Sequence, residues 1–228
     1  MRIFYDSKGV PIKYNLKISD IINVGSTGRI YKVNDDVCLK MIDKDRKLVD
    51  FEVLSLISKL KLSNFYEIFD FLYNRNNKNT GYTMKYYKSE NINVLTMPCS
   101  YILDNFNYIY NSVIELSNKG VVVTDMSLNN IILNSSSITV IDADYYYFNR
   151  RCTYNRLLAD NLEEVLLLFA SLLYDSIKIF DINQENSNMV YNSLNMLINS
   201  FSDISSLSSE LAGYKYPIDY IKKYVKMR

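Results

Sequence analysis

The sequence predicts an α+β protein, with strands in its first part and helices in its second. Between residues 3 and 33, apolar and polar residues alternate in short runs that break at Gly9-Val10-Pro11 and at the loop 25–28, as strands joined by turns do. Residues 100–118 and 157–173 instead carry apolar residues at helical spacing. A run of strands followed by a run of helices is typical of the α+β class.

Further elements follow from the same patterns along the chain. The helix over 100–118 is expected to end at Gly120, because glycine commonly closes a helix. The other expected elements are a strand over 37–42, a helix from about 46 to 62, a strand pair over 65–73 and 80–86, and two or three amphipathic helices with a basic end within 185–228.

Composition limits the possible functions. The chain has 228 residues, 48% of them hydrophobic, enough for one sizeable domain or two lobes. Its net charge of +1 gives no reason to expect a nucleic-acid partner. It contains no histidine, which excludes Ser-His and Cys-His catalysis and imidazole metal sites.

Cysteine usage and the absence of long apolar runs indicate a cytoplasmic protein. The three cysteines, Cys38, Cys99 and Cys152, are far apart with no CxxC spacing, so neither a thiolate zinc site nor a disulfide framework is expected. The first residues lack the apolar run of a signal peptide, and no apolar segment is long enough for a membrane span.

The stretch 121–146 holds the most suggestive polar groups. Asp125 is followed by Asn130, and two short apolar runs then lead to Asp142. Two carboxylates and an amide at the tips of a hairpin can hold Mg²⁺ on a polyphosphate, because Mg²⁺ takes hard oxygen ligands. The same residue types are also common in solvated turns, so the pattern alone leaves both interpretations open.

Three features of the first part are also compatible with phosphate binding. Glycines at 25 and 28 let a loop between two strands approach a phosphate chain, although a plain hairpin turn has the same pattern. Lys40 is the one charge in an apolar strand, and needs an anionic partner if it points inward rather than to an edge. Glu52, beside the apolar stripe of the next helix, is expected to reach Lys40 unless it is a solvated surface residue.

In this order, the glycine loop, strand lysine, helix glutamate, Asp-x4-Asn and post-strand aspartate resemble the protein-kinase fold in a small, divergent, bacterial-like form. The resemblance covers roughly residues 18–175. It implies a two-lobed fold: an N-lobe over 1–84 with an antiparallel sheet and one helix, a hinge over 85–93, and a mostly helical C-lobe over 94–228.

The resemblance also implies roles for individual residues. Asp125 would take the proton of the substrate hydroxyl, and Asn130 and Asp142 would bind Mg²⁺ or Mn²⁺. Asp160 resembles the aspartate that starts a long buried helix and braces the catalytic loop. Residues implied in ATP binding are Gly25, Ser26, Thr27, Gly28 and Ile30 of the loop, Lys40 with Glu52, and Met84, Lys85, Tyr86 and Tyr87 at the gatekeeper and hinge.

Several positions depart from the family pattern. Asn23 replaces the first loop glycine, and Val123-Thr124 replaces the His-Arg pair, so control by a phosphorylated activation loop is not expected. Ser127 and Asn129 remove a cation near the transferred phosphate, which can be worth roughly 3 kcal/mol, or about a hundredfold in rate. The sequence 142–144 reads Asp-Ala-Asp in place of Asp-Phe-Gly, and the following peptide platform is short or missing.

The function expected from the resemblance is an ATP-dependent kinase that phosphorylates protein Ser, Thr or Tyr hydroxyls, with ATP and Mg²⁺ or Mn²⁺ as cofactors. Phosphoryl transfer requires positioning and charge neutralisation and no histidine. Two alternatives stay open: a kinase for a small molecule, favoured by the short peptide platform, and a pseudokinase that acts as a nucleotide-binding interaction module.

Overall fold

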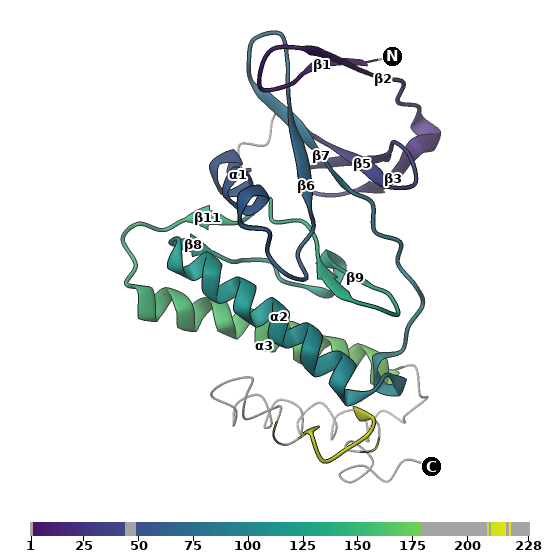
Figure 1. Ribbon diagram of the computed structural model, residues 1–228, viewed down its shortest axis with the longest axis vertical. Coiled ribbons are helices and arrows are strands. Elements are labelled where there is room, and N and C mark those ends of the chain that lie inside the picture. Colours follow the sequence, from purple (N-terminus) through teal and green to yellow (C-terminus); the bar gives the residue numbers. More distant parts are fainter. Residues whose placement is uncertain (1, 44–48, 179–208, 210, 218, 220–228) are drawn as a thin grey trace.

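The computed structural model describes residues 2–43, 49–178, 209, 211–217 and 219. These residues form a mixed α/β protein with a curled antiparallel sheet and three long helices, which confirms the predicted combination of strands and helices (Figure 1). None of the described helices has both the length and the apolar character needed to cross a membrane. Most of the helices expected within 185–228 lie outside the described residues, and the lobe boundaries at 84–85 and 93–94 stay predictions.

The sheet has seven strands in the order β2-β1-β6-β7-β5-β4-β3, with antiparallel pairing throughout. Its strands are β1 (Arg2–Tyr5), β2 (Pro11–Tyr14), β3 (Ile21–Val24), β4 (Gly28–Lys32), β5 (Val37–Ile42), β6 (Ile68–Tyr73) and β7 (Asn79–Lys85). The alternation seen in the sequence therefore corresponds to real strands, and β5 covers the predicted range 37–42.

Two glycines let the neighbours of β5 approach it closely. A Cβ atom on Gly28 of β4 would lie 1.8 Å from the Met41 carbonyl oxygen, and one on Gly81 of β7 would lie 2.1 Å from the Lys40 carbonyl oxygen. Either distance is far inside a van der Waals contact, so only glycine fits. Gly28 is thus required for strand packing, whatever its role toward a ligand.

Helix α1 (Phe51–Leu60) covers one side of the sheet. The Asp50 side chain caps it, accepting hydrogen bonds from the amides of Glu52 (3.0 Å) and Val53 (3.2 Å). Val53, Leu54 and Ile57 are its buried residues, spaced as expected for one helical face. The predicted start near residue 46 falls on residues outside those that the structure describes, and the described helix begins after its cap, Asp50.

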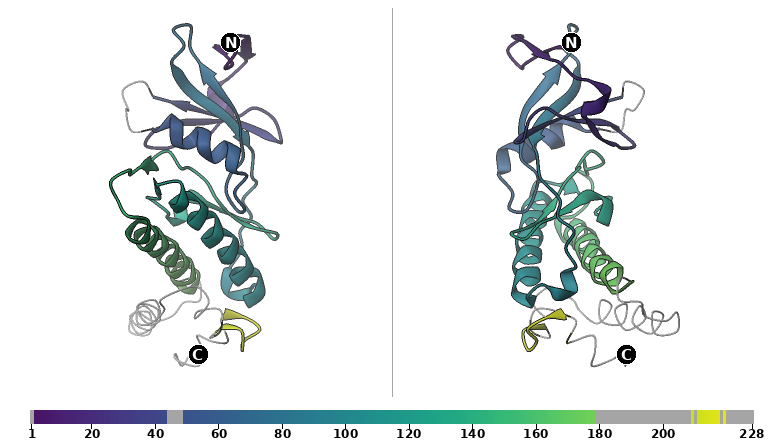
Figure 2. Two further views of the ribbon diagram at one scale, coloured as in Figure 1. Left: turned by 60° about the vertical axis from the view of Figure 1, so that its left-hand side comes forward. Right: turned by 90° about the vertical axis from the view of Figure 1, so that its right-hand side faces the viewer.

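Helices α2 (Cys99–Asn118) and α3 (Tyr154–Lys178) lie side by side below the sheet in Figures 1 and 2. The Phe106 and Phe169 rings meet edge to face between them, with centroids 4.7 Å apart. Gly120 follows α2 with a φ of 77°, in the left-handed region that glycine adopts without strain, so the predicted helix end is confirmed.

Two short strand pairs lie between the sheet and these helices. Strand β9 (Ile131–Leu133) pairs with β10 (Ile138–Val140), and β8 (Val121–Val122) pairs with β11 (Tyr147–Phe148). Three single-turn 3₁₀ helices, η1 (Ile18–Asp20), η2 (Val94–Thr96) and η3 (Leu128–Asn130), complete the described elements. The β9–β10 hairpin is the one expected from the apolar runs, and it carries residue 142 toward the sheet.

Candidate functional site

Lys40 of β5 points inward and is almost completely buried, with 1% of its surface exposed. Its Nζ atom lies 2.6 Å from Oδ2 of Asp142 and 2.7 Å from Oδ2 of Asp144. Both distances are within ion-pair range, so the ammonium is held between the two carboxylates. An ammonium has three N–H donors, so these two contacts leave one for a ligand oxygen.

The expected partner of Lys40 was Glu52, and that prediction is wrong for this structure. Glu52 is exposed in the first turn of α1, and no ion pair joins it to Lys40. The inward positions of the helix are Val53, Leu54 and Ile57. The side chain of residue 52 therefore falls at the edge of the apolar face and reaches solvent.

Asp142 and Asp144 have different environments. The Asp142 side chain is 23% exposed, whereas Asp144 is fully buried. The pKa of Asp142 is raised above its ordinary value by burial and by the neighbouring Asp144, and Lys40 opposes this effect. Asp142 also has a φ of 63°, uncommon for a residue with a side chain, and such backbone conformations concentrate at functional sites.

Asp144 is the most heavily hydrogen-bonded carboxylate of the site. Its Oδ2 accepts from the Thr27 hydroxyl at 2.5 Å, and its Oδ1 accepts from the Tyr82 hydroxyl at 2.9 Å. The glycine loop is thereby held against the segment after β10, and the side-chain hydroxyls of Ser26 and Tyr145, 2.5 Å apart, hold it at a second point. The sequence showed Asp144 as an additional carboxylate but gave no signal for these contacts.

Asp125 and Asn130 are brought together as expected. Asn130 Nδ2 donates to the carbonyl oxygen of Asp125 at 2.8 Å and to its Oδ2 at 2.9 Å. Asp125 is exposed and has a φ of 56°, a second left-handed aspartate in the site. Because the Ile141 amide donates to the Asn130 carbonyl oxygen at 2.8 Å, the pair lies beside the start of the 142–144 segment.

Tyr146 connects these groups electrostatically. It is 1% exposed, and its pKa is raised chiefly by burial and further by the carboxylates of Glu164, Asp142 and Asp125. Asp125 and Asp142, which are far apart in the sequence, therefore act on one buried phenol.

The residues present can accommodate a divalent cation only together with a ligand. Across the described ranges, no group of three or more His, Cys, Asp or Glu residues could hold a metal by itself. Asn130 uses its NH₂ group toward Asp125, which leaves its amide oxygen as an acceptor, and Asp142 is partly exposed. Two protein oxygens completed by phosphate and water suit Mg²⁺, which seldom has an all-protein cage.

Asn161, not Asp160, braces the segment before Asp125. Asn161 is fully buried in α3; its Oδ1 accepts from the Val123 amide at 2.8 Å, and its Nδ2 donates to the Val121 carbonyl oxygen at 2.8 Å. Asp160 is exposed and lies 3.9 Å from Arg156. The helix begins at Tyr154, so residue 160 is not in its first turn, and its side chain is exposed; the prediction for Asp160 is therefore wrong.

Glu164, one turn further along α3, was not identified from the sequence. Its Oε2 accepts a long hydrogen bond of 3.4 Å from the Met126 amide, next to Asp125. Burial and Asp125 contribute to raising the pKa of Glu164, and the Met126 amide opposes them. The helical spacing of 161 and 164 could have indicated that both face the same neighbour.

At the expected gatekeeper, Met84 is buried in β7. The amides of Lys85 and Tyr86 already donate to the carbonyl oxygens of Glu67 (2.9 Å) and Asp36 (2.8 Å). The Tyr87 amide has no such partner within the part of the chain that the structure describes. The backbone N–H of Tyr87 is therefore available to donate to an adenine ring, whereas those of Lys85 and Tyr86 are already used.

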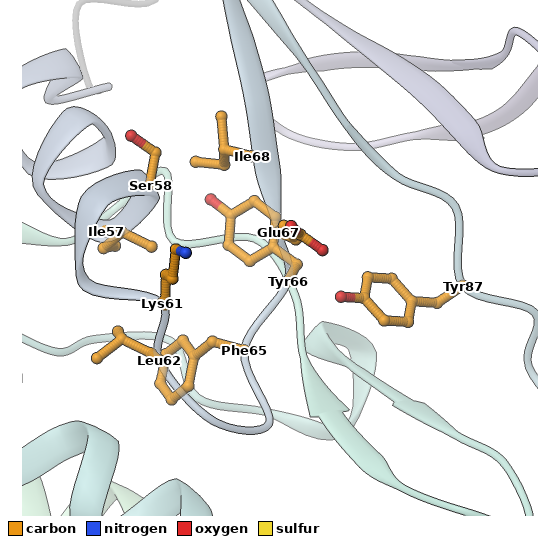
Figure 3. A pocket seen from close by; sticks show the side chains of 9 residues that line it. All are labelled: Ile57, Ser58, Lys61, Leu62, Phe65, Tyr66, Glu67, Ile68 and Tyr87. Carbon is orange, nitrogen blue, oxygen red and sulfur yellow. The ribbon is translucent and has the colours of Figure 1, made fainter.

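A cavity of about 380 Å³ lies behind this connection, between α1 and residue 87. Figure 3 shows Ile57, Ser58 and Lys61 on one side of it and Tyr87 on the other. Its remaining lining residues are Leu62, Phe65, Tyr66, Glu67 and Ile68. The cavity is thus distinct from the group around Lys40, Asp125 and Asp142.

No protein-family model matches the chain, and no curated protein matches it in sequence. Among solved structures, it is similar to the kinase Lpg2603 of Legionella pneumophila bound to IP6, with 16% sequence identity and a TM-score of 0.44. This similarity covers 76% of this chain and 67% of that chain, and it concerns only the general course of the backbone.

Proposed function

We propose that this chain is an ATP-dependent phosphotransferase that acts as a protein kinase on Ser, Thr or Tyr hydroxyls. The observation that carries the proposal is that the buried Lys40 pairs with Asp142, while the amide of the preceding residue, Ile141, donates to the carbonyl oxygen of Asn130, the partner of the exposed Asp125. Phosphoryl transfer depends on positioning and electrostatic stabilisation, which a lysine, two acids and an amide can provide.

In this proposal, Lys40 and the backbone amides of Ser26 and Thr27 bind the triphosphate, since the Gly25 amide already donates to the Gly28 carbonyl oxygen at 2.9 Å. The Asn130 amide oxygen and the Asp142 carboxylate hold Mg²⁺, which supplies neutralisation of the charge on the phosphate oxygens. Asp142 pairs with Lys40 in the structure.

Asp125 orients the acceptor hydroxyl and takes its proton. The hydroxyl oxygen forms a bond to the γ-phosphorus, the bond from that phosphorus to the β-γ bridging oxygen breaks, and ADP leaves with the electron pair. Asn130 steers the Asp125 carboxylate by donating to its Oδ2 at 2.9 Å. Because Asp125 is exposed, a hydroxyl on a large partner such as a protein can approach it.

A small-molecule acceptor is the second candidate. Only residues 143–153 connect Asp142 to α3, and part of this connection is used in β11, which pairs with β8. Little backbone is therefore left on which a peptide substrate could lie. This observation favours a compact acceptor, whereas the exposure of Asp125 favours a protein.

The test is transfer of the labelled γ-phosphate of ATP, with Mg²⁺ or Mn²⁺, to the protein itself or to an added generic protein. We expect label in the wild type and its loss in Asp125→Ala and Asp142→Ala, while the exposed-site control Asp160→Ala retains it. ATP consumption that depends on a small hydroxylated compound, without protein labelling, would support the second candidate. Nucleotide binding without any transfer would indicate a pseudokinase, and absence of nucleotide binding would refute the site assignment.

A further inference from the structure

Asp144 lies at a junction of three separate segments. Its carboxylate receives the Thr27 hydroxyl from the glycine loop, the Tyr82 hydroxyl from β7 and the Lys40 ammonium from β5. The residue is fully buried, so none of these contacts is weakened by water. A charged group this deep is tolerated only when it is paired and hydrogen-bonded, as it is here.

The two acids near Lys40 are therefore unequal. Both Asp144 oxygens are engaged by protein groups, which leaves no exposed oxygen for a cation. Asp142 is partly exposed, and its Oδ1 receives only a long bond of 3.3 Å from the Asp144 amide. Asp142 therefore has an oxygen available to bind a metal ion, whereas Asp144 is fixed as an ion-pair partner of Lys40.

Lys40 needs a negatively charged partner that remains beside it when the Asp142 carboxylate binds a metal ion. An unpaired ammonium in this buried position would carry a large desolvation cost. Glu52 is exposed on α1 and does not supply that charge. Among the residues that the structure describes, Asp144 is the remaining carboxylate within ion-pair distance of Nζ.

We propose that Asp144 is the positioning residue for Lys40, in the place that the helix glutamate has in protein kinases, and that it couples the lysine to the glycine loop through Thr27. This inference rests on the proposed function. Because Asp144 and Asp142 belong to one short segment, the pair forms without an inward movement of α1. The position of the 142–144 segment, rather than that of α1, then determines whether Lys40 is ready for nucleotide.

The experiment measures binding of Mg²⁺–ATP by titration calorimetry to the wild type, Asp144→Asn, Glu52→Gln, Lys40→Met and the double variant Lys40→Met/Asp144→Asn. We expect Asp144→Asn to weaken binding roughly tenfold or more, and Glu52→Gln to change it less than about twofold. In the Lys40→Met background, Asp144→Asn should add less than about twofold, because it acts through the lysine. A purely structural role would not produce this coupling.

A second measurement, the melting temperature of each variant without nucleotide, tests the proposal even where a variant binds Mg²⁺–ATP too weakly for calorimetry. Lys40→Met leaves two carboxylates without their counter-charge, so the double variant is expected to melt at a higher temperature than Lys40→Met alone. Independent effects of the two substitutions, or a Glu52→Gln variant as impaired as Asp144→Asn, would overturn the inference. A wild type that binds no nucleotide would overturn the proposed function and the inference with it. Nucleotide binding insensitive to Asp144→Asn would overturn the inference alone.

Discussion

Replacing Asn161 by alanine should destabilise the protein by removing the brace between α3 and the segment before Asp125. The fully buried amide makes three hydrogen bonds: it accepts from the Val123 amide, donates to the Val121 carbonyl oxygen and donates to the Ser117 hydroxyl at 2.9 Å. At a net value of about 1 kcal/mol for each bond, Asn161→Ala should lower the free energy of unfolding by about 3 kcal/mol. For a chain of this length, that loss corresponds to a fall in Tm of about 6–12 °C.

The assay is thermal unfolding followed by circular dichroism, with Asp160→Ala as the matched control. Asp160 is the adjacent acid, it is exposed, and its 3.9 Å contact with Arg156 is a surface pair, so its loss should change stability by less than about 0.5 kcal/mol. Asn161→Asp retains the acceptor for the Val123 amide but sets a buried carboxylate oxygen against the Val121 carbonyl oxygen, and should destabilise the protein at least as much as Asn161→Ala. Equal melting temperatures for Asn161→Ala and Asp160→Ala would refute the assignment of the brace to Asn161.

Three further predictions concern pH, packing and thiol reactivity. The pKa of Asp142 is raised in the folded state, so its carboxyl group stays protonated to a higher pH there than in the unfolded chain. The free energy of unfolding therefore falls as pH rises through that raised pKa. Asp142→Asn should raise Tm at neutral pH and give no gain below about pH 4, as measured by thermal unfolding at both pH values. Gly28→Ala should lower the free energy of unfolding by about 1–3 kcal/mol, because the new Cβ atom meets the Met41 carbonyl oxygen of β5. Gly25→Ala, whose Cβ would have no atom closer than 3.9 Å, should lower it by less than about 0.5 kcal/mol. Equal Tm values for the two variants would contradict this reasoning. Burial raises the pKa of Cys38 to about 11, so a thiol reagent at about pH 8 should label the half-buried Cys152 well before Cys38, and the reverse order by mass spectrometry would be inconsistent with the structure.

Much of the fold followed from local patterns in the sequence. The alternation before residue 33, the apolar strand over 37–42 and the helical spacing over 100–118 each specify an element through residues that are close neighbours. Helix and strand boundaries were accurate where a clear signal existed, as at Gly120 with its positive φ. The described start of α1 is marked by the Asp50 cap, a signal that the apolar pattern does not contain.

The candidate site was predicted in its chemical groups but not in its pairings. Asp125 with Asn130 is a local pair whose short spacing is visible in the sequence. The pairing of Lys40 with Asp144 rather than Glu52 is not visible, because both acids lie at positions compatible with an inward side chain. Asn161 was overlooked although it lies four residues from the buried Leu157 and Val165, because the family resemblance pointed to the adjacent aspartate.

The sequence by itself determined that strands precede the long helices and that histidine takes no part in the chemistry. It also identified the polar groups of the candidate site: Lys40, Asp125, Asn130 and Asp142. Only the tertiary structure decided which carboxylate meets Lys40, which residue braces the segment before Asp125 and what holds the glycine loop. The physical reason is the range of the interactions: periodicity records neighbours a few residues apart, whereas the Thr27–Asp144 hydrogen bond joins residues separated by 117 positions. Such contacts exist only after the sheet and the β9–β10 hairpin have packed together.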